Sequence, residues 1–272
     1  MSMLGRKQQE LDWRGKPIRC DRCAHAQAQT LKQCEPGKIC VHSARPSRIE
    51  HFFEANPGTA SGYLTSERGE VRAAAVRNAE VIHLPAMLTD TDAEVRWNTA
   101  LRLPRRFLLR LRDDADREVR IRVAGAIEGD ELAPMMSDPD YFVRQIVARR
   151  IAVPLLRSML DDPDPQVRRA VVERIGPEWL NRLAQDEDEG VRSEVARRIP
   201  LHQLHTLTKD ADCRVRYVVA QRAQHSVLKL LAADEDSMIR ELVQERLTTE
   251  RDVSTAGHVL LRMPVTDREK GA

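Results

Sequence analysis

The sequence predicts an all-α fold in which short helical repeats stack into a solenoid, preceded by a small cysteine-rich module. Three observations predict this class. The dipeptide Val-Arg returns every 24 residues from Val71 to Val215, and Ile239-Arg240 continues the spacing. Leu and Asp recur at fixed positions within the same period, and four cysteines lie within residues 20–40, ahead of the first repeat. A fixed short period indicates a solenoid, in which each unit buries its apolar face against its neighbours.

Composition agrees with a helical stack and sets limits on function. Aromatic residues are 4% and charged residues 32% of the 272, which suits packing by small aliphatic side chains. The net charge of +2 does not attract the whole chain to nucleic acid or membranes, although residues 1–46 carry nine Lys or Arg against four acids. The sequence has neither a membrane-length apolar run nor the apolar stretch of a secretory signal. We therefore expect a cytoplasmic protein with reduced cysteines.

Each repeat should begin with a helix of about three turns, because its apolar positions have helical spacing. Counted from Val-Arg, positions one and five are mostly Val, and position nine is mostly aliphatic. These positions lie within about 80° on a helix and form one apolar stripe. The ends of this helix are marked in several repeats by Pro104, Pro154, Gly176-Pro177 or Pro200. Proline cannot donate a hydrogen bond to a continuing helix.

A second, shorter element follows the first helix of each repeat. Position fourteen is Leu in seven consecutive repeats, and position seventeen is Leu or Met, which is again helical spacing. About seven or eight residues are available, so we expect a short helix, including the tight 3₁₀ type. The leucines at position fourteen are Leu84, Leu108, Leu132, Leu156, Leu180, Leu204 and Leu228.

Asp occupies positions twenty and twenty-two in all seven complete repeats, from Asp90 and Asp92 onward. The second Asp stands just before the next helix, where its side chain can accept hydrogen bonds from exposed backbone N–H groups. Pro165 directly after Asp164 agrees with the preference for proline at the first helical position. We interpret these acids as structural caps rather than catalytic or metal-binding groups.

The recurring arginines admit two interpretations. Position two is Arg in all eight repeats, and position eight is Arg in six. In the first interpretation their stems cover apolar surface and their guanidinium groups pair with an Asp of an adjoining turn, forming a salt-bridge ladder. In the second they form a basic track for phosphates or an acidic protein, strengthened at Arg149-Arg150 and Arg197-Arg198. Because no aromatic residues are interleaved to stack bases, binding of single-stranded nucleic acid is disfavoured.

The chain divides into four predicted segments. Residues 1–46 form the cysteine-rich module, and residues 47–70 form a degenerate first repeat that caps the array. Residues 71–247 form the array itself. Residues 248–272 form a C-terminal cap and tail, in which a short apolar patch covers the last repeat and the final residues, from Thr266, fray.

The cysteine cluster predicts a metal centre. Cys20, Cys23, Cys34 and Cys40 lie within 21 residues, whereas Cys213 lies alone in a repeat. In an intracellular protein, four clustered thiols indicate metal binding rather than disulfides. The Cys-x₂-Cys pair turns two thiolates toward one point, the other two cysteines bracket a Pro-Gly turn, and the surrounding Lys and Arg favour thiolates.

The identity of the metal does not follow from spacing. Four cysteines serve both structural zinc and iron–sulfur clusters. His25 and His42 stand near the ligands, but four thiolates already complete a site. We therefore interpret both histidines as exposed loop residues.

An N-terminal four-cysteine segment followed by units reading V-R-x-x-V-A-x-R-I…L…L…D-x-D resembles the leucine-rich repeat variant family over nearly the whole chain. The resemblance implies units that pair an α-helix with a 3₁₀-helix in a right-handed superhelix without strands. It also implies a [4Fe–4S] cluster ligated by Cys20, Cys23, Cys34 and Cys40, with Zn as the alternative cofactor. Members tend to occur in nitrogen-fixing bacteria, which indicates an accessory role there. The family has no established enzymatic activity.

Two function classes follow from these features, and a third is not expected. The first is a non-enzymatic protein-interaction scaffold whose cluster serves redox sensing, electron transfer or structure, since solenoids present long concave surfaces to protein partners. The alternative is a nucleic-acid-binding protein that uses the basic N-terminal module and the arginine track. An enzyme is not expected, because no nucleophile has a partner base, and His202 and His205 are interpreted as surface residues. We expect a protein partner, no membrane and no small-molecule substrate.

Overall fold

The structure is a computed structural model that describes residues 10–260, with side chains described to Thr249. It consists of two compact units, residues 1–135 (unit 1) and residues 136–272 (unit 2). Every regular element in the described part is helical, and extended backbone pairing there is limited to isolated bridges in the cysteine-rich module. The predicted all-α repeat fold is therefore confirmed.

Unit 1 contains the cysteine-rich module and the first repeats. The module holds η1 (Cys20–Arg22) and α1 (Ala26–Thr30), where η denotes a 3₁₀-helix. The repeats that follow are α2 (Pro46–Ala55) with η2 (Pro57–Tyr63), α3 (Gly69–Val76) with η3 (Val81–Thr89), α4 (Ala93–Arg102) with α5 (Arg105–Leu108) and η4 (Leu109–Leu111), and α6 (Arg117–Ala126) with η5 (Gly129–Ser137), whose last residues belong to unit 2. The segment predicted to be a degenerate repeat thus has the same α–3₁₀ order as its successors.

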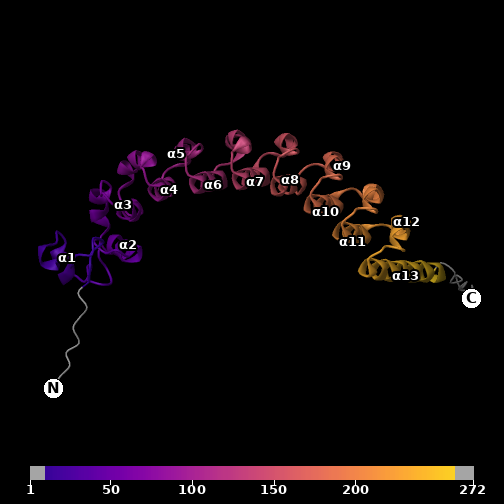
Figure 1. The fold of residues 1–272 in the computed structure, drawn as a ribbon, viewed down its shortest axis with the longest axis horizontal. Coiled ribbons are helices and arrows are strands. Elements are labelled where there is room, and N and C mark those ends of the chain that lie inside the picture. The colour runs from indigo at the N-terminus through magenta and orange to yellow at the C-terminus, as the bar shows by residue number, and fades with distance from the viewer. Residues whose placement is uncertain (1–9, 261–272) are drawn as a thin grey trace, which may run out of the picture. The chain divides into compact units, whose positions relative to one another are not determined.

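Unit 2 continues the same alternation. Its repeats are α7 (Tyr141–Arg150) with η6 (Val153–Met159), α8 (Pro165–Val172) with η7 (Pro177–Trp179) and α9 (Leu180–Leu183), α10 (Glu189–Arg198) with η8 (Leu201–Leu207), and α11 (Cys213–Arg222) with α12 (His225–Leu228) and η9 (Lys229–Leu231). The last helix is α13 (Ser237–Leu260). Within each unit the longer helices form one row and the short elements form a second row (Figure 1).

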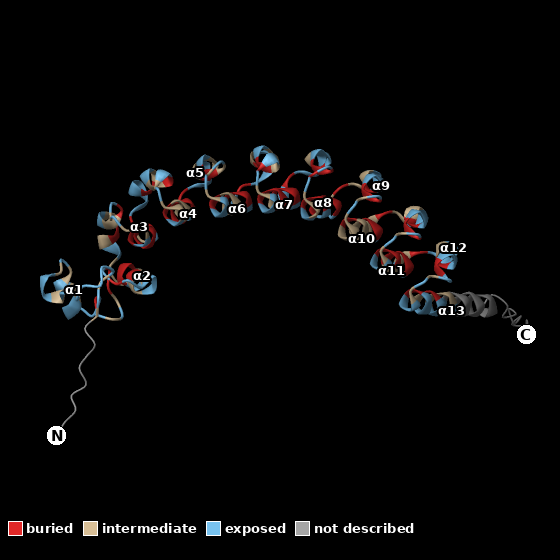
Figure 2. Cartoon of the chain, in the orientation of Figure 1, coloured by how far each residue is buried: buried red, intermediate tan, exposed pale blue. Residues whose placement is uncertain are grey.

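The core lies between these two rows and between neighbouring repeats. Val at position one, the residue at position five and Leu at position fourteen are buried throughout, as Val143, Val147 and Leu156 illustrate with no exposed surface. Figure 2 shows buried residues along both rows of each unit. The core is thus a series of small layers, each built from one repeat and its neighbours.

Asp at position twenty-two caps the following helix, as predicted. The side chain of Asp164 accepts the backbone N–H of Gln166 at 2.8 Å, at the start of α8. Equivalent N-caps are Asp92, Asp116, Asp140, Asp188, Asp212 and Asp236. The interpretation of these acids as structural groups is confirmed for all seven.

The end of the array differs from the other repeats. α13 continues to Leu260 without the break that ends the first helix elsewhere. Position fourteen of this last repeat is Asp252 rather than Leu, and no proline interrupts residues 237–260, so the signals for a second element are missing. The predicted fraying from Thr266 lies outside the described residues. No helix in the described range 10–260 is long and apolar enough to cross a membrane.

Candidate metal centre

The cysteine-rich module is held in place by short-range turns and by ion pairs, of which Glu10–Arg48 and Arg14–Glu67 link it to the following repeats. Cys20 begins η1, and the backbone N–H of Cys23 donates to the Cys20 carbonyl at 3.3 Å, which closes a tight turn between the two residues. The backbone N–H of Cys34 donates to the Ala28 carbonyl at 3.2 Å, and that of Cys40 donates to the Arg48 carbonyl at 3.1 Å. The Cys40 contact anchors the module to α2.

A tight turn separates the last two cysteines. Glu35 and Ile39 pair across it, and Gly37 adopts a left-handed φ of 83° at its tip. A side chain there would be strained and would meet the Glu10 carboxylate at 2.8 Å. Glu10 is in turn fixed by Arg48 at 2.7 Å. The turn therefore brings Cys34 and Cys40 to the same side of the module.

The fold brings the four predicted cysteines within electrostatic range of one another. Cys34 and Cys40 are buried, with 8% and 3% exposed surface, whereas Cys20 and Cys23 are half-buried. Burial, followed by the charges of the other three sulfurs and a hydrogen bond with Cys40, raises the pKa of Cys34 to about 11. Burial also raises the pKa of Cys20 and of Cys40. Such a set of thiols ionises readily only when a positive metal centre offsets the burial and the mutual repulsion.

The described residues do not form a ready-made metal site, and the fifth cysteine lies elsewhere. In the described part of the chain, no group of three or more His, Cys, Asp or Glu side chains is arranged as a ready site for a metal ion. Cys213 is exposed at the start of α11 in unit 2.

Both histidines of the module contact the cysteine site, which the sequence interpretation missed. His42 is exposed, as expected, but its Nε2 lies 3.5 Å from Sγ of Cys23. His25 is half-buried, so its assignment as an exposed residue is wrong: its Nε2 lies 2.6 Å from the Tyr63 hydroxyl, and its ring packs edge-on against Phe52 at 4.8 Å. Aromatic residues in the capping repeat were the only sequence signal for this contact.

The position-two arginines form the predicted salt-bridge ladder. Nε and Nη2 of Arg144 donate to the two carboxylate oxygens of Asp162 at 2.7 and 2.9 Å, and Nη1 donates to the carbonyl of Asp138 at 2.8 Å. The same two-pronged ion pair, or fork, joins an arginine to the aspartate 18 residues later in other repeats: Arg72 to Asp90, Arg96 to Asp114, Arg168 to Asp186, Arg192 to Asp210 and Arg216 to Asp234. Each arginine therefore ties two successive turns together.

The ion pairs of the ladder lower the pKa values of several of its aspartates. Burial alone would raise the pKa of Asp90, but hydrogen bonds from Arg72 and from the Asp92 backbone, together with the charges of Arg72 and Arg96, lower that pKa below its usual value. The pKa values of Asp114 and Asp234 are lowered by the same balance. These carboxylates are therefore ionised structural groups.

The position-eight arginines have a different role from the one expected. Nη1 of Arg222 donates to the carbonyls of Ala196 and Ile199 at 2.6 and 2.9 Å, at the end of the preceding long helix. Arg102, Arg174, Arg198 and Arg246 donate to carbonyls in the same place. The prediction that they reach an Asp is wrong for these five, because the last carbonyls of the preceding helix lack partners within that helix and lie within their reach.

The four arginines predicted to bind a partner lie in different environments. Arg149 and Arg150 are exposed at the end of α7. Arg197 is exposed and pairs with Glu194 at 2.9 Å. Arg198 is half-buried and bound to the carbonyls of Val172 and Ile175, so it is not available to an external phosphate.

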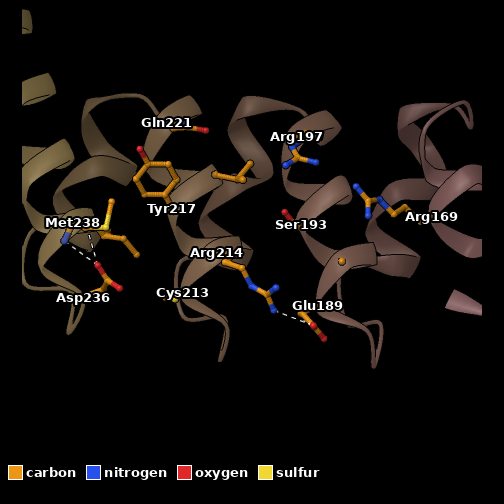
Figure 3. A pocket seen from close by; sticks show the side chains of 13 residues that line it. Arg169, Glu189, Ser193, Arg197, Cys213, Arg214, Tyr217, Gln221, Asp236 and Met238 are labelled. Atoms are coloured by element: carbon orange, nitrogen blue, oxygen red, sulfur yellow. Dashed lines mark hydrogen bonds and ion pairs between the residues drawn. The ribbon is translucent and has the colours of Figure 1, made fainter. Parts of the chain in front are cut away.

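A cavity of about 570 Å³ opens on unit 2 across α8, α10, α11 and α13 (Figure 3). Arg197 lines it, and the side chains of Arg169, Ser193 and Tyr217, which also line it, make no hydrogen bond or ion pair with the described residues. Arg214 is held on its wall by Glu189 at 2.9 Å. Arg169, Ser193 and Tyr217 occupy position three of successive repeats. The residue type at this position varies from repeat to repeat, so the repeat pattern did not predict the cavity.

Comparisons with known proteins match both parts of the chain. A family model described as "LRV protein FeS4 cluster" matches residues 10–62, which include all four clustered cysteines, and a HEAT repeat model matches residues 152–177. An uncharacterized 27.7 kDa protein from the nifB 3′ region of Rhodobacter capsulatus is 38% identical over 94 residues. That match covers 35% of this chain and 38% of the relative, so the chain spans well under half of that protein.

The solved structure of a leucine-rich repeat variant, described as having a novel repetitive structural motif, is similar over most of the chain. It is 36% identical, with a TM-score of 0.81, and the match covers 84% of this chain and 98% of that one. The repeat period, the alternation of α- and 3₁₀-helices and the N-terminal cysteine module all agree with this likeness. The chain belongs to the leucine-rich repeat variant family.

Proposed function

We propose that the protein is a non-enzymatic protein-interaction scaffold that carries a redox-active [4Fe–4S] cluster in its N-terminal module. The observation that carries this proposal is that four thiols, two of them buried, lie within electrostatic range of one another in the segment matched by the FeS4 cluster model. Cys20, Cys23, Cys34 and Cys40 would hold the cluster. When bound, such a cluster supplies one-electron transfer at a potential set by its protein surroundings.

The chemistry of the donor set supports the cluster. Thiolates are the ligands that iron–sulfur clusters take, and four are gathered here. Burial and mutual charge make these thiols hard to ionise alone, as the pKa of about 11 at Cys34 illustrates. The half-buried Cys20 and Cys23 leave one side of the site close to solvent, as electron exchange requires.

Protein binding by the repeats is supported by the cavity of unit 2. Its polar groups at Arg169, Ser193 and Tyr217 lack partners within the described chain, while Met238 adds exposed apolar surface. Tyrosine, arginine and methionine side chains are enriched at protein-binding surfaces, and Tyr217, Arg169 and Met238 place one of each in this cavity. We assign the partner to the class of proteins, with no small-molecule substrate.

The nucleic-acid alternative has less support. A basic track needs free guanidinium groups, but six position-two arginines bind aspartates of the ladder and five position-eight arginines bind helix carbonyls. Of the four arginines predicted to form the track, Arg197 pairs with Glu194 and Arg198 with helix carbonyls, so the track that phosphate binding would need is interrupted. We also propose that the protein is cytoplasmic, and the relative from the nifB 3′ region supports an accessory role in nitrogen fixation.

Site-specific photocrosslinking tests the scaffold proposal. A photoreactive phenylalanine analogue would replace Tyr217 in the cavity or, as a control, Leu230, which is 63% exposed on the short-element row of the same unit. We expect a protein adduct that forms at position 217 and not at 230, and that weakens when Arg169→Glu is added. Equal labelling at both positions, or no protein adduct at 217, would contradict this use of the cavity.

A further inference from the structure

His42 connects two of the four sulfurs in the cysteine site. Its side-chain Nε2 lies 3.5 Å from Sγ of Cys23, and its backbone N–H hydrogen-bonds the sulfur of Cys40. The tautomer that carries its proton on Nε2 donates a hydrogen bond to Cys23. One residue thus joins the segment after η1 to the segment before α2.

Cys23 receives a second donor from a rigid neighbour. The backbone N–H of His25 donates to Sγ of Cys23 at 3.4 Å. The His25 side chain cannot turn freely, because its Nε2 is bound to the Tyr63 hydroxyl at 2.6 Å and its ring contacts Phe52. Phe52 is fully buried in the capping repeat, so the N–H that faces Cys23 is positioned by the core of the array.

We propose that His42 is a positioning residue that sets the reduction potential of the cluster by hydrogen-bonding the Cys23 thiolate. This inference rests on the proposed cluster at Cys20, Cys23, Cys34 and Cys40. A hydrogen bond to a ligating sulfur withdraws negative charge from it and stabilises the reduced cluster, which carries one more electron. The His42 side chain therefore raises the midpoint potential, while the cysteines alone hold the iron.

Two substitutions of His42 test the contribution of its side-chain hydrogen bond separately from that of its backbone. His42→Leu removes the side-chain donor, whereas His42→Gln keeps an N–H donor at a similar reach, and neither changes the backbone N–H that serves Cys40. His51→Leu is the matched control, because His51 is exposed on α2, outside the cysteine site. All variants are purified without oxygen as the full chain.

The readouts are iron and sulfide content, and a potentiometric titration with dithionite as the electron donor, all at one pH. We expect equal iron and sulfide in every variant. His42→Leu should lower the equilibrium constant for one-electron reduction about threefold to tenfold, which is about 28 to 59 mV. His42→Gln should restore most of the potential, and His51→Leu should leave it unchanged.

Three results would overturn the inference in distinguishable ways. If His42→Leu keeps its cluster and its potential, the hydrogen bond has no influence and the proposed function stands. If His42→Leu loses its iron while His51→Leu keeps it, His42 is a ligand or an essential support rather than a tuning donor. If the unaltered protein holds no iron and no sulfide, both the inference and the proposed cluster fail.

Discussion

Asp162→Ala should destabilise unit 2 far more than the same change at the preceding residue, Asp161→Ala. Asp162 forms the fork with Arg144, and the two side chains are only 5% and 10% exposed. Asp161 pairs with Arg182, but those side chains are 74% and 54% exposed. The two aspartates are adjacent in the chain, so the comparison isolates the environment of the pair.

The expected cost follows from what each change leaves behind. Removing the Asp162 carboxylate deletes two charge-assisted hydrogen bonds from Arg144 and one from the Asp164 backbone N–H. A buried cation that loses its partner costs about 3–5 kcal/mol, and Arg144 keeps its bond to the Asp138 carbonyl, so we expect about 3 kcal/mol. An exposed pair contributes about 0–1 kcal/mol, which is the loss expected for Asp161→Ala.

The free energy of unfolding would be measured by urea denaturation followed by far-ultraviolet circular dichroism. Because helical arrays need not unfold in one step, amide hydrogen exchange in α7 and α8 would locate the loss. Replacing both partners, Arg144→Met with Asp162→Leu, should cost less than Asp162→Ala because no buried charge is left alone. Equal losses for Asp161→Ala and Asp162→Ala would refute the claim that the ladder stabilises the repeats.

Two further predictions concern charge. The lowered pKa of Asp90 means that its ion pair stabilises the fold above the unfolded value, near 3.8, and that this contribution is lost as the pH falls through the lower folded value. Urea midpoints should therefore be similar at pH 7 and pH 5 and should drop below about pH 4; an unchanged midpoint at pH 3 would contradict this. Arg198→Ala should cost about 1.5–3 kcal/mol because it leaves the carbonyl of Ile175 without its charged donor, whereas Arg197→Ala, which breaks an exposed pair, should cost under about 0.5 kcal/mol. The same denaturation measurement distinguishes them, and equal costs would show that the carbonyl contacts do not stabilise the array.

The sequence predicts those structural features that depend on the same type of side chain recurring at the same position of each repeat. Val-Arg, the leucine at position fourteen and the paired aspartates each have one physical role, and that role recurs in register, so the α–3₁₀ order, the caps and the Arg144–Asp162 type of fork could be anticipated. The partners of Arg222 could not, because every residue has a backbone carbonyl and no residue type marks the ones left unpaired at a helix end.

The site was predictable in part for the same reason. Four clustered cysteines are recognisable in the sequence as metal ligands by their residue type alone. The contact between His42 and Cys23, in contrast, joins residues 19 positions apart through irregular turns, which no sequence periodicity describes. Similarly, His25 is half-buried by Phe52 and Tyr63, which belong to the capping repeat, and this partial burial depends on how the module packs on that repeat. Tertiary packing of a non-repeating segment is the part that local pattern does not determine.

The central claim is that the thiols at Cys20, Cys23, Cys34 and Cys40 hold an iron–sulfur cluster. The most direct measurement is the iron, acid-labile sulfide and zinc content of the full chain purified without oxygen, together with its electron paramagnetic resonance spectrum after reduction with dithionite. We predict about four iron and four sulfide per chain, a signal that appears on reduction, loss of both in Cys34→Ser, and no loss in Cys213→Ser, whose thiol is exposed in unit 2. One zinc per chain without sulfide would contradict the claim and leave a zinc-bound module at the end of the array.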